Sequence, residues 1–324
     1  MHPRVVALQK LFSESLTKEP IQGSPEELYA PMAYILSLGG KRLRPVMVLL
    51  GAELFGGETK EALPAAEAVE WFHNFSLLHD DIMDDAPLRR GKATVHEKWN
   101  TNIAILSGDA MLVKCYDFLL RLRRDVQPEI FSLFNKTAIE VCEGQQLDMN
   151  FEVRDDVTVD EYLHMIENKT SVLLAAALKM GALIAEAPED QAQHLYEFGL
   201  NVGLAFQLQD DYLDVYGDQS KVGKQVGGDI ISDKKTYLWL MAEAQANPEQ
   251  RAELHRFINV KDRNSEKVAC VTAVYDALGI PKQVSQKMDA YFSEAMNHLG
   301  IIDATEEQKE PLRHLAETLM QREH

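Results

Sequence analysis

Four aspartates lie within six residues of the segment "LLHDDIMDDAPLRR", which runs from Leu77 to Arg90. Carboxylates packed this closely repel one another and raise each other's pKa unless a cation lies among them. If a helix continues through Asp80, then Asp80 and Asp84 share one face with Cβ atoms about 5–6 Å apart, and Asp81 and Asp85 form a second such pair. Each pair can offer oxygens to a hard cation such as Mg²⁺, which also accepts phosphate oxygens. The alternative is a solvated acidic helix end.

A second acidic cluster carries the same D-D-x-x-D spacing. "FQLQDDYLDVYGD" places Asp210, Asp211 and Asp214 at the end of another apolar helix, 130 residues after Asp80. Two such clusters are hard to explain as solvated faces, and if they face each other in a helical bundle they need cations between them. The spacing does not fit an EF-hand, which requires D-x-D-x-D-G and a distal glutamate. We therefore predict a clamp that holds several Mg²⁺ ions.

Basic residues gather on a turn early in the chain. In "GGKRLRP", which spans Gly39 to Pro45, two glycines end the helix that starts at Ser24, and the proline keeps the loop from continuing as helix. Lys41, Arg42 and Arg44 are therefore expected on a constrained turn. The segment lacks the G-x-x-x-x-G-K-[ST] spacing of a P-loop and a preceding strand, which argues against an NTPase.

Further basic residues fall beside the acidic motifs or inside apolar helices. Two arginines follow the first motif directly, "ENKTS" lies within an apolar helix, and "GKQVGGDIISDKKT" surrounds a glycine-rich loop. This placement predicts two phosphate-binding sites, one bridged by metal and one purely basic. The residues concerned are Arg89, Arg90, Lys169, Lys224, Lys234 and Lys235.

The composition sets the context for these sites. The chain has 324 residues, of which 46% are hydrophobic, so it can bury a sizeable core. Its formal charge of −18 argues against nucleic acid or anionic lipid as a general partner, and an anionic ligand needs a local basic cluster. The three cysteines form no metal or disulfide pattern, and no run approaches the roughly 20 apolar residues of a membrane span. The N-terminus is typical of an amphipathic helix and not of a signal peptide. We expect a soluble, cytoplasmic protein.

The hydrophobic pattern predicts helices nearly throughout. Apolar residues recur every three to four positions, and helix-start signals occur at Ser24 ("SPEE", with Pro25 at the first helical position) and Thr158 ("TVDE"). Neither strand-like alternation nor hairpin dipeptides are evident, and no linker divides the chain. We predict one all-α domain over residues 1–324, with helical stripes over 62–83, 103–120, 130–147, 162–184 and 191–214.

Taken together, the motifs resemble those of the trans-isoprenyl diphosphate synthases, which are chain-elongating, head-to-tail prenyltransferases. The segments "GGKRLRP", "LLHDDIMDDAPLRRGKATVH", "KT", "FQLQDDYLD" and "GKQVGGDIISDKKT" occur in the family's order. The resemblance covers Gly39 to Tyr237 by motif and the C-terminal remainder by helical character only. It implies an isoprenoid-synthase-type helical bundle with a central active-site cavity, and a homodimer.

The resemblance also implies residue roles. Asp80, Asp84, Asp210 and Asp214 would bind several Mg²⁺ ions that hold an allylic diphosphate (dimethylallyl, geranyl or farnesyl), with Asp81 and Asp211 as ligands or as partners of metal-bound water. Residues that match those holding the allylic diphosphate are Arg89, Lys169, Lys224 and Lys234. Residues that match the metal-free pocket for isopentenyl diphosphate are Lys41, Arg44, His73 and Arg90. Thr170 and Gln207 would line the space where the carbocation forms. His73 could instead be a core histidine.

The implied reaction starts with ionisation of the allylic C–O bond, helped by Mg²⁺ and the lysines. The isopentenyl double bond then attacks the cation, and the released diphosphate takes the proton. A glycine-rich lid over 222–231 would exclude water. Phe75, five residues before Asp80 and about 7.5 Å away along the helix axis, would limit chain growth unless it is plain core packing. In the family that the chain resembles, one aromatic residue beside a small one such as Ser76 is typical of a twenty-carbon synthase, so the resemblance implies geranylgeranyl diphosphate as the product.

Alternatives remain at this point. A farnesyl diphosphate synthase is the nearest. A terpene cyclase usually replaces the second motif by an Asn/Ser/Glu pattern and needs no isopentenyl pocket. A non-catalytic subunit of a heteromeric synthase typically loses one acidic motif, and both are intact here.

Overall fold

The computed structural model describes residues 1–18, 20–217, 227–258, 260 and 263–321. Contacts divide the chain into two compact units. The first unit comprises Met1–Lys136, Leu173–Tyr196 and Ile302–His314, and the second comprises Thr137–Val172, Glu197–Ile301 and Leu315–His324. The chain passes from one unit to the other within the helices α7 (Gln127–Val153), α10 (Glu189–Tyr216) and α17 (Glu306–Met320). The expectation of a single domain stays a prediction.

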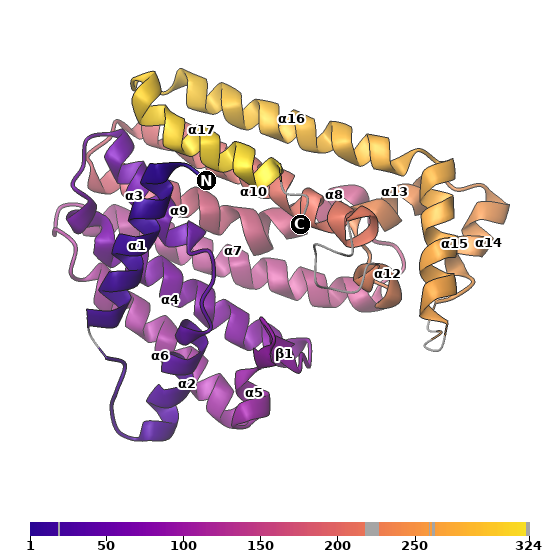
Figure 1. Ribbon diagram of the computed structural model, residues 1–324, viewed down its shortest axis with the longest axis horizontal. Coiled ribbons are helices and arrows are strands. Elements are labelled where there is room, and N and C mark those ends of the chain that lie inside the picture. Colours follow the sequence, from indigo (N-terminus) through magenta and orange to yellow (C-terminus); the bar gives the residue numbers. More distant parts are fainter. Residues whose placement is uncertain (19, 218–226, 259, 261–262, 322–324) are drawn as a thin grey trace. The chain divides into compact units, whose positions relative to one another are not determined.

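The first unit is built mainly from helices near the N-terminus. α4 packs against both α3 and α6 (Figure 1), and α9 is apolar on nearly every face and therefore buried. A two-stranded hairpin, β1 with β2, follows α4. The elements are α1 (Pro3–Lys18), α2 (Glu26–Ser37), α3 (Leu43–Leu54), α4 (Thr59–Met83), β1 (Leu88–Arg89), β2 (Lys92–Ala93), α5 (Val95–Lys98), α6 (Thr101–Leu119) and α9 (Val172–Ile184).

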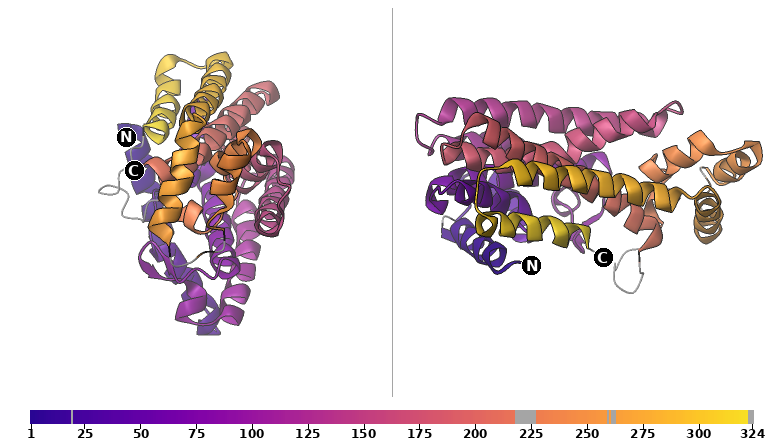
Figure 2. Two further views of the ribbon diagram at one scale, coloured as in Figure 1. Left: turned by 90° about the vertical axis from the view of Figure 1, so that its right-hand side faces the viewer. Right: turned by 90° about the horizontal axis from the view of Figure 1, so that it is seen from above.

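The second unit contains most of the C-terminal helices. α14 packs against α15 and α13 against α16 (Figures 1 and 2). A buried hydrophobic cluster, which includes Tyr162, Leu208, Leu238 and Tyr275, forms its core. The elements are α8 (Val159–Ile166), a π-helix η1 (Glu167–Ser171), α12 (Gly228–Ile231), α13 (Tyr237–Gln245), α14 (Pro248–His255), α15 (Asn264–Ala277) and α16 (Ile280–Ile301).

These elements confirm the all-α class. Four of the five predicted stripes each coincide with one helix, and Thr158 forms the capping box expected with Glu161 at the start of α8. The stripe over 162–184 is not one regular helix, because η1 interrupts it between α8 and α9. Within the described ranges, no helix is both long and apolar enough to cross a lipid bilayer.

Two predictions about the early chain are wrong. Ser24 does not cap α2, since Pro25 occupies the N-cap position and makes no side-chain cap bond. Arg44 does not lie on the turn, because α3 already begins at Leu43. Pro45 is accommodated in the first helical turn, where its missing N–H would have no partner anyway.

The hairpin was not anticipated from the sequence. Its register pairs Leu88 with Ala93 and Arg89 with Lys92, which leaves Arg90 and Gly91 as a two-residue turn. Both turn residues have positive φ, 53° and 73°, as a type I′ turn requires. Asparagine or aspartate usually occupies the first position of such a turn, so an Arg-Gly turn escapes the usual signal.

Candidate active site

The first aspartate motif lies at the C-terminal end of α4. The Asp84 amide donates to the Asp80 carbonyl at 2.9 Å, which confirms that these two residues are one helical turn apart. Asp85 leaves the helix with φ of 48°. The expected second pair of Asp81 with Asp85 is therefore wrong, because a left-handed residue turns its side chain away from the helix face.

Asp81 is buried and paired with an arginine from the hairpin. Arg89 Nε lies 2.8 Å from Asp81 Oδ2, and Arg89 Nη2 lies 2.8 Å from Asp81 Oδ1. The same Nη2 lies 3.5 Å from Asp80 Oδ2. A bidentate pair of this kind fixes the plane of the guanidinium, so Asp81 holds Arg89 next to the metal-ligand candidate Asp80.

The proposed isopentenyl pocket contains a cluster of arginines around His73. Arg44 Nη1 lies 3.3 Å from His73 Nε2. Burial first, and then the positive charges of Arg44, Arg90, Arg89 and Arg42, hold the pKa of His73 well below its usual value. The ring is therefore neutral at neutral pH, and the four guanidinium groups create a strongly positive region in a chain of charge −18.

Two of these arginines lack an acidic partner. Among the described residues, neither Arg44 nor Arg90 forms an ion pair with a carboxylate. Burial lowers the pKa of Arg44 to about 10, with Arg90 adding to the effect and Glu70 opposing it. Arg90 donates to the carbonyl of Gly39, whose φ is positive. Arg44 is partly buried and Arg90 is exposed, and two positive charges without an ion-pair partner make this region suited to bind an anion.

Arg42 supports the basic turn and does not belong to the unpaired set. It caps α3 in a left-handed conformation and pairs with the buried Glu70 of α4, while also donating to the carbonyl of Leu36. Asn74 donates to the same glutamate at 2.9 Å. Lys41 lies exposed on the turn, and its carbonyl accepts from Gln9. Sequence reasoning missed Glu70, although a carboxylate within the apolar stripe of α4 was the available signal.

The predicted chain-length residues lie one to two turns before Asp80. Phe75 is 8% exposed and packs between the rings of Phe72 and His79, with centroids at 5.6 and 4.7 Å. Phe72 in turn packs against Phe134. The Ser76 hydroxyl donates to the carbonyl of His73. Phe75 is thus part of a row of aromatic rings, which fits both a barrier to chain growth and core packing.

The second aspartate motif lies near the end of α10. Asp210 is exposed, whereas Asp211 is buried and accepts hydrogen bonds from Tyr162 and from Gln207. Burial raises the pKa of Asp211 to about 7; the hydroxyl of Tyr162 opposes this shift and the charge of Asp229 adds to it. The hydrogen bonds from Tyr162 and Gln207 therefore do not offset the cost of burying the negative charge of Asp211, which fits a site for a divalent cation.

Asp214 has a partner in the loop that follows. Its Oδ2 accepts from the Asp229 amide at 2.9 Å, and its carbonyl accepts from the Gly227 amide. Lys234 is exposed, and its amide bonds to the Asp229 carbonyl, while the ammonium of Lys235 donates to the Phe151 carbonyl at 2.7 Å. Lys224 and the first half of the predicted lid, residues 222–226, lie outside the described residues.

The π-helix η1 presents Lys169 and Thr170. Lys169 Nζ lies 2.6 Å from Asp148 Oδ2 of α7, and Thr170 donates to Gln207 at 3.1 Å. A π-turn redirects side chains within a helix and is frequent at functional sites. Sequence reasoning missed Asp148, since nothing in the local pattern links it to a lysine 21 residues later.

Two glycines let other helices approach η1 closely. A Cβ on Gly144 of α7 would lie 2.3 Å from the Lys169 amide nitrogen, and one on Gly203 of α10 would lie 2.7 Å from Ser171 Cα. Only glycine fits at these crossings. Backbone contact on both sides therefore fixes the position of Lys169 and Thr170.

The structure thus assembles the predicted residues into two sets. The first unit brings together the first aspartate motif, the hairpin arginines and His73. The second unit brings together the second motif with η1. The two aspartate motifs lie at helix ends and offer only oxygen atoms as ligands, which are the ligands that Mg²⁺ prefers. The predicted metal ligands and the role of each basic residue stay predictions.

Comparisons with known proteins agree with these features. The sequence profile of the polyprenyl synthetase family matches residues 25–278. A geranylgeranyl diphosphate synthase of Methanosarcina mazei is 45% identical over 220 residues, which cover 67% of this chain and 68% of the relative. A short chain isoprenyl diphosphate synthase of Methanothermobacter thermautotrophicus is 36% identical over 303 residues, which cover 93% and 92%. The crystal structure of a geranylgeranyl pyrophosphate synthase superposes with a TM-score of 0.94 at 45% identity, covering 99% of each chain.

Proposed function

Because the chain belongs to the polyprenyl synthetase family, we propose that it joins isopentenyl diphosphate head to tail to an allylic diphosphate, with Mg²⁺, to give geranylgeranyl diphosphate. It is a short-chain prenyltransferase. The observation that most strongly supports this reaction is the cluster of Arg44, Arg90 and neutral His73 beside the first aspartate motif. A cyclase with a single diphosphate substrate has no need for a second, metal-free anion pocket of this kind.

We assign the first diphosphate to the aspartate motifs. Asp80, Asp84, Asp210 and Asp214 are the proposed Mg²⁺ ligands. Mg²⁺, when bound, supplies positive charge that stabilises the leaving diphosphate. Basic residues add to that charge from fixed positions, and only those held rigidly do so without reorganising during the reaction. The proposed basic residues are Arg89, which Asp81 orients, Lys169, which Asp148 orients, Lys234, and Lys224.

We assign the second diphosphate, that of isopentenyl diphosphate, to Lys41, Arg44, His73 and Arg90. Arg44 and Arg90 supply positive charge, and neither forms an ion pair with a carboxylate within the described residues. His73 Nε2 already faces Arg44 Nη1 at 3.3 Å. As a neutral ring it can accept from that arginine through one nitrogen and donate to a phosphate oxygen through the other.

Polar groups near the reacting carbons stabilise the cation without trapping it. Thr170 and Gln207 are hydrogen-bonded to each other, and the Gln207 side chain continues to Asp211. This fixed chain presents oxygen lone pairs of Thr170 and Gln207 to positive charge. A base among the protein groups is not required, since the released diphosphate can take the proton from the adduct.

The length of the product is set by Phe75 in this proposal. Its ring is backed by Phe72 and, beyond that, by Phe134, so a growing chain that reaches it meets a layer and not a single side chain. The small neighbour Ser76 leaves room for a longer product than two adjacent aromatic rings would allow. The relatives in Methanosarcina mazei and in the superposed crystal structure carry the name of the twenty-carbon synthase.

A second copy of the chain is the proposed partner. Leu106, Val113 and Leu120 are 60%, 65% and 61% exposed on α6 and its C-cap, although a side chain of this kind is normally covered. Their spacing of seven residues places them along one face of the helix, as in helices that pair along their length. We therefore propose a homodimer that uses α6.

The reaction is tested with purified protein, Mg²⁺, isopentenyl diphosphate and, in separate assays, dimethylallyl, geranyl and farnesyl diphosphate. We expect diphosphate release with every primer that is shorter than the product, and a twenty-carbon product by mass spectrometry. Chelation of the metal should abolish turnover. Absence of diphosphate release with all three primers would contradict the proposal, and a fifteen-carbon end product would correct the chain length alone.

A further inference from the structure

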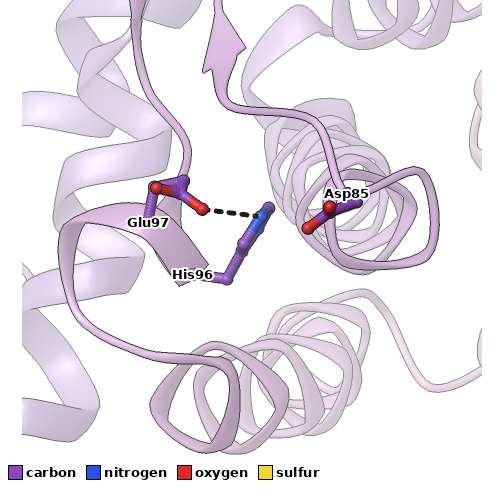
Figure 3. A group of neighbouring side chains, drawn as sticks. All are labelled: Asp85, His96 and Glu97. Carbon is purple, nitrogen blue, oxygen red and sulfur yellow. Dashed lines mark ion pairs between the residues drawn. The ribbon is translucent and has the colours of Figure 1, made fainter.

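We propose that Asp85, His96 and Glu97 form a binding site for a transition-metal cation such as Zn²⁺, separate from the aspartate-motif ligands. One nitrogen and two carboxylate oxygens of these residues lie within 4.8 Å of one another. The histidine ring lies between the two carboxylates, which come from the end of α4 and from α5 (Figure 3). The inference does not depend on the prenyl transfer reaction.

A closed loop holds Asp85 opposite α5. The Ala86 amide donates to the Asp81 carbonyl at 3.0 Å, which ends α4 in a tight turn. Thr94, buried at the start of α5, donates through its hydroxyl to the Ala86 carbonyl at 2.8 Å and through its amide to the Pro87 carbonyl at 3.2 Å. The chain between these residues is the β1–β2 hairpin. Asp85 and His96 therefore meet because hydrogen bonds close the loop between them, and not by chance contact of two surface side chains.

The ring of His96 is buried and has no hydrogen-bond partner within the described residues, as expected of a metal ligand. Its side chain is only 7% exposed. Neither ring nitrogen has a hydrogen-bond partner in the described part of the chain, and the nearest carboxylate oxygen, Glu97 Oε1, lies 3.8 Å from Nε2. Buried polar groups are almost always hydrogen-bonded or bound to an ion. A cation between Nε2 and the carboxylates would satisfy the ring.

The donor set selects the type of cation. An imidazole nitrogen with carboxylate oxygens suits Zn²⁺ and related transition metals, whereas Mg²⁺ prefers oxygens and water. Zinc binds histidine nitrogen and carboxylate oxygen at about 2.0–2.2 Å, and in a tetrahedral site ligand atoms lie about 3.3 Å apart. Asp85 and Glu97 are exposed, so their side chains can rotate the remaining distance toward His96. Water would complete the coordination.

Occupation of this site would have a defined effect on the neighbouring chain. The cation would tie α5 to the end of α4, directly after Asp84, and would close the loop from which Arg89 and Arg90 extend. The site therefore lies where a structural metal can stiffen the segment that carries both an acidic ligand candidate and two basic ones.

The test is zinc binding to the intact protein at equilibrium, measured by metal analysis after dialysis against chelator-buffered Zn²⁺ in a large excess of Mg²⁺. We expect one zinc ion per chain that Mg²⁺ does not displace. His96→Gln should weaken its binding by at least about 100-fold, as should Asp85→Asn. Because Asp85 is exposed, its variant should fold normally, which circular dichroism checks. His255→Gln is the matched control. His255 Nε2 also lies 2.9 Å from a carboxylate oxygen, that of Glu243, but within the described residues His255 does not belong to a group of three potential metal ligands.

Three results would overturn the inference. One is the absence of a zinc ion that survives excess Mg²⁺. Another is unchanged zinc affinity in both His96→Gln and Asp85→Asn. The third is loss of the zinc in Asp80→Asn with retention in His96→Gln, which would place the ion on the aspartate motif instead.

Discussion

Arg89 grips the buried carboxylate of Asp81 with two nitrogens, each 2.8 Å from a different oxygen. Asp81 is 3% exposed, so the pair is screened from water on one side. Asp81 is therefore part of the scaffold, and Asp80 and Asp84 are the metal ligands that we propose in the first motif.

This pair predicts different outcomes for neighbouring aspartates. Asp81→Asn should lower the free energy of unfolding by about 3 kcal/mol, because it leaves the partly buried charge of Arg89 without a counterion, and it should also lower turnover. Asp80→Asn should lower turnover with little loss of stability. Urea unfolding and initial rates of diphosphate release test both variants. Equal stability of the two would show that the Arg89–Asp81 pair does not hold the hairpin.

His73 predicts a pH effect of known sign. Its pKa is lowered in the folded protein by burial and by the surrounding arginines, whereas in the unfolded chain it is about 6.5. As the pH falls below about 6.5, His73 binds a proton in the unfolded chain but stays neutral in the folded protein. The free energy of unfolding therefore falls. The stabilising contribution is complete above that pH. His73→Gln should flatten this part of the stability curve.

The same residue reports on anion binding. Addition of inorganic diphosphate should raise the pKa of His73, because a bound anion offsets the positive charges that lower it. Nitrogen chemical shifts of the ring, followed by NMR across pH, measure this directly. A histidine that titrates normally without diphosphate would contradict the arginine cluster as described.

The product-length assignment predicts opposite effects at adjacent positions. Phe75→Ala removes one ring from this row of aromatic side chains and should lengthen the product. Ser76→Phe adds a ring beside it and should shorten the product toward fifteen carbons. Mass spectrometry of the products from farnesyl diphosphate and from geranyl diphosphate separates these outcomes. Unchanged distributions in both variants would assign Phe75 to core packing.

The glycine beside the π-helix predicts sensitivity to a single methyl group. Gly144→Ala would place Cβ 2.3 Å from the Lys169 amide, so the helices must separate, at a cost of about 1–3 kcal/mol, and turnover should fall as Lys169 moves. Gly300→Ala is the control, since a Cβ there meets nothing within 4 Å and alanine favours the helix by up to about 1 kcal/mol. Thermal unfolding compares the two. Normal activity in Gly144→Ala would sink the claim that backbone contact positions Lys169.

The exposed face of α6 predicts the oligomeric state. Light scattering of the eluted protein should give twice the mass of the 36.6 kDa chain. The double variant Leu106→Lys/Val113→Lys should be monomeric, because it brings like charges and polar groups into the interface. Val6→Lys, which changes another exposed valine, on α1, should stay dimeric. A monomeric wild-type protein would contradict the proposed dimer.

Much of the site could be predicted from residue types and spacing. The period of apolar residues gave α4 and α10, and a helix through Asp80 necessarily places Asp84 one turn later. What lay beyond prediction depended on contacts between distant segments. Asp148 meets Lys169 only because α7 crosses η1 at Gly144. Asp81 finds Arg89 only because an Arg-Gly turn folds the chain back, and no residue type in "ENKTS" encodes a π-turn.

The hairpin carries a consequence for how the two substrates are matched. Arg89 and Arg90 are consecutive, yet Arg89 is held by Asp81 of the first aspartate motif and Arg90 by the Gly39 carbonyl, next to the cluster that we propose for isopentenyl diphosphate. The hairpin turn therefore fixes the distance between the two arginines that we propose to bind the two substrates. Inserting or deleting one residue in the hairpin would displace both guanidinium groups at once. A change of hairpin length therefore cannot alter the binding of one proposed substrate without altering that of the other.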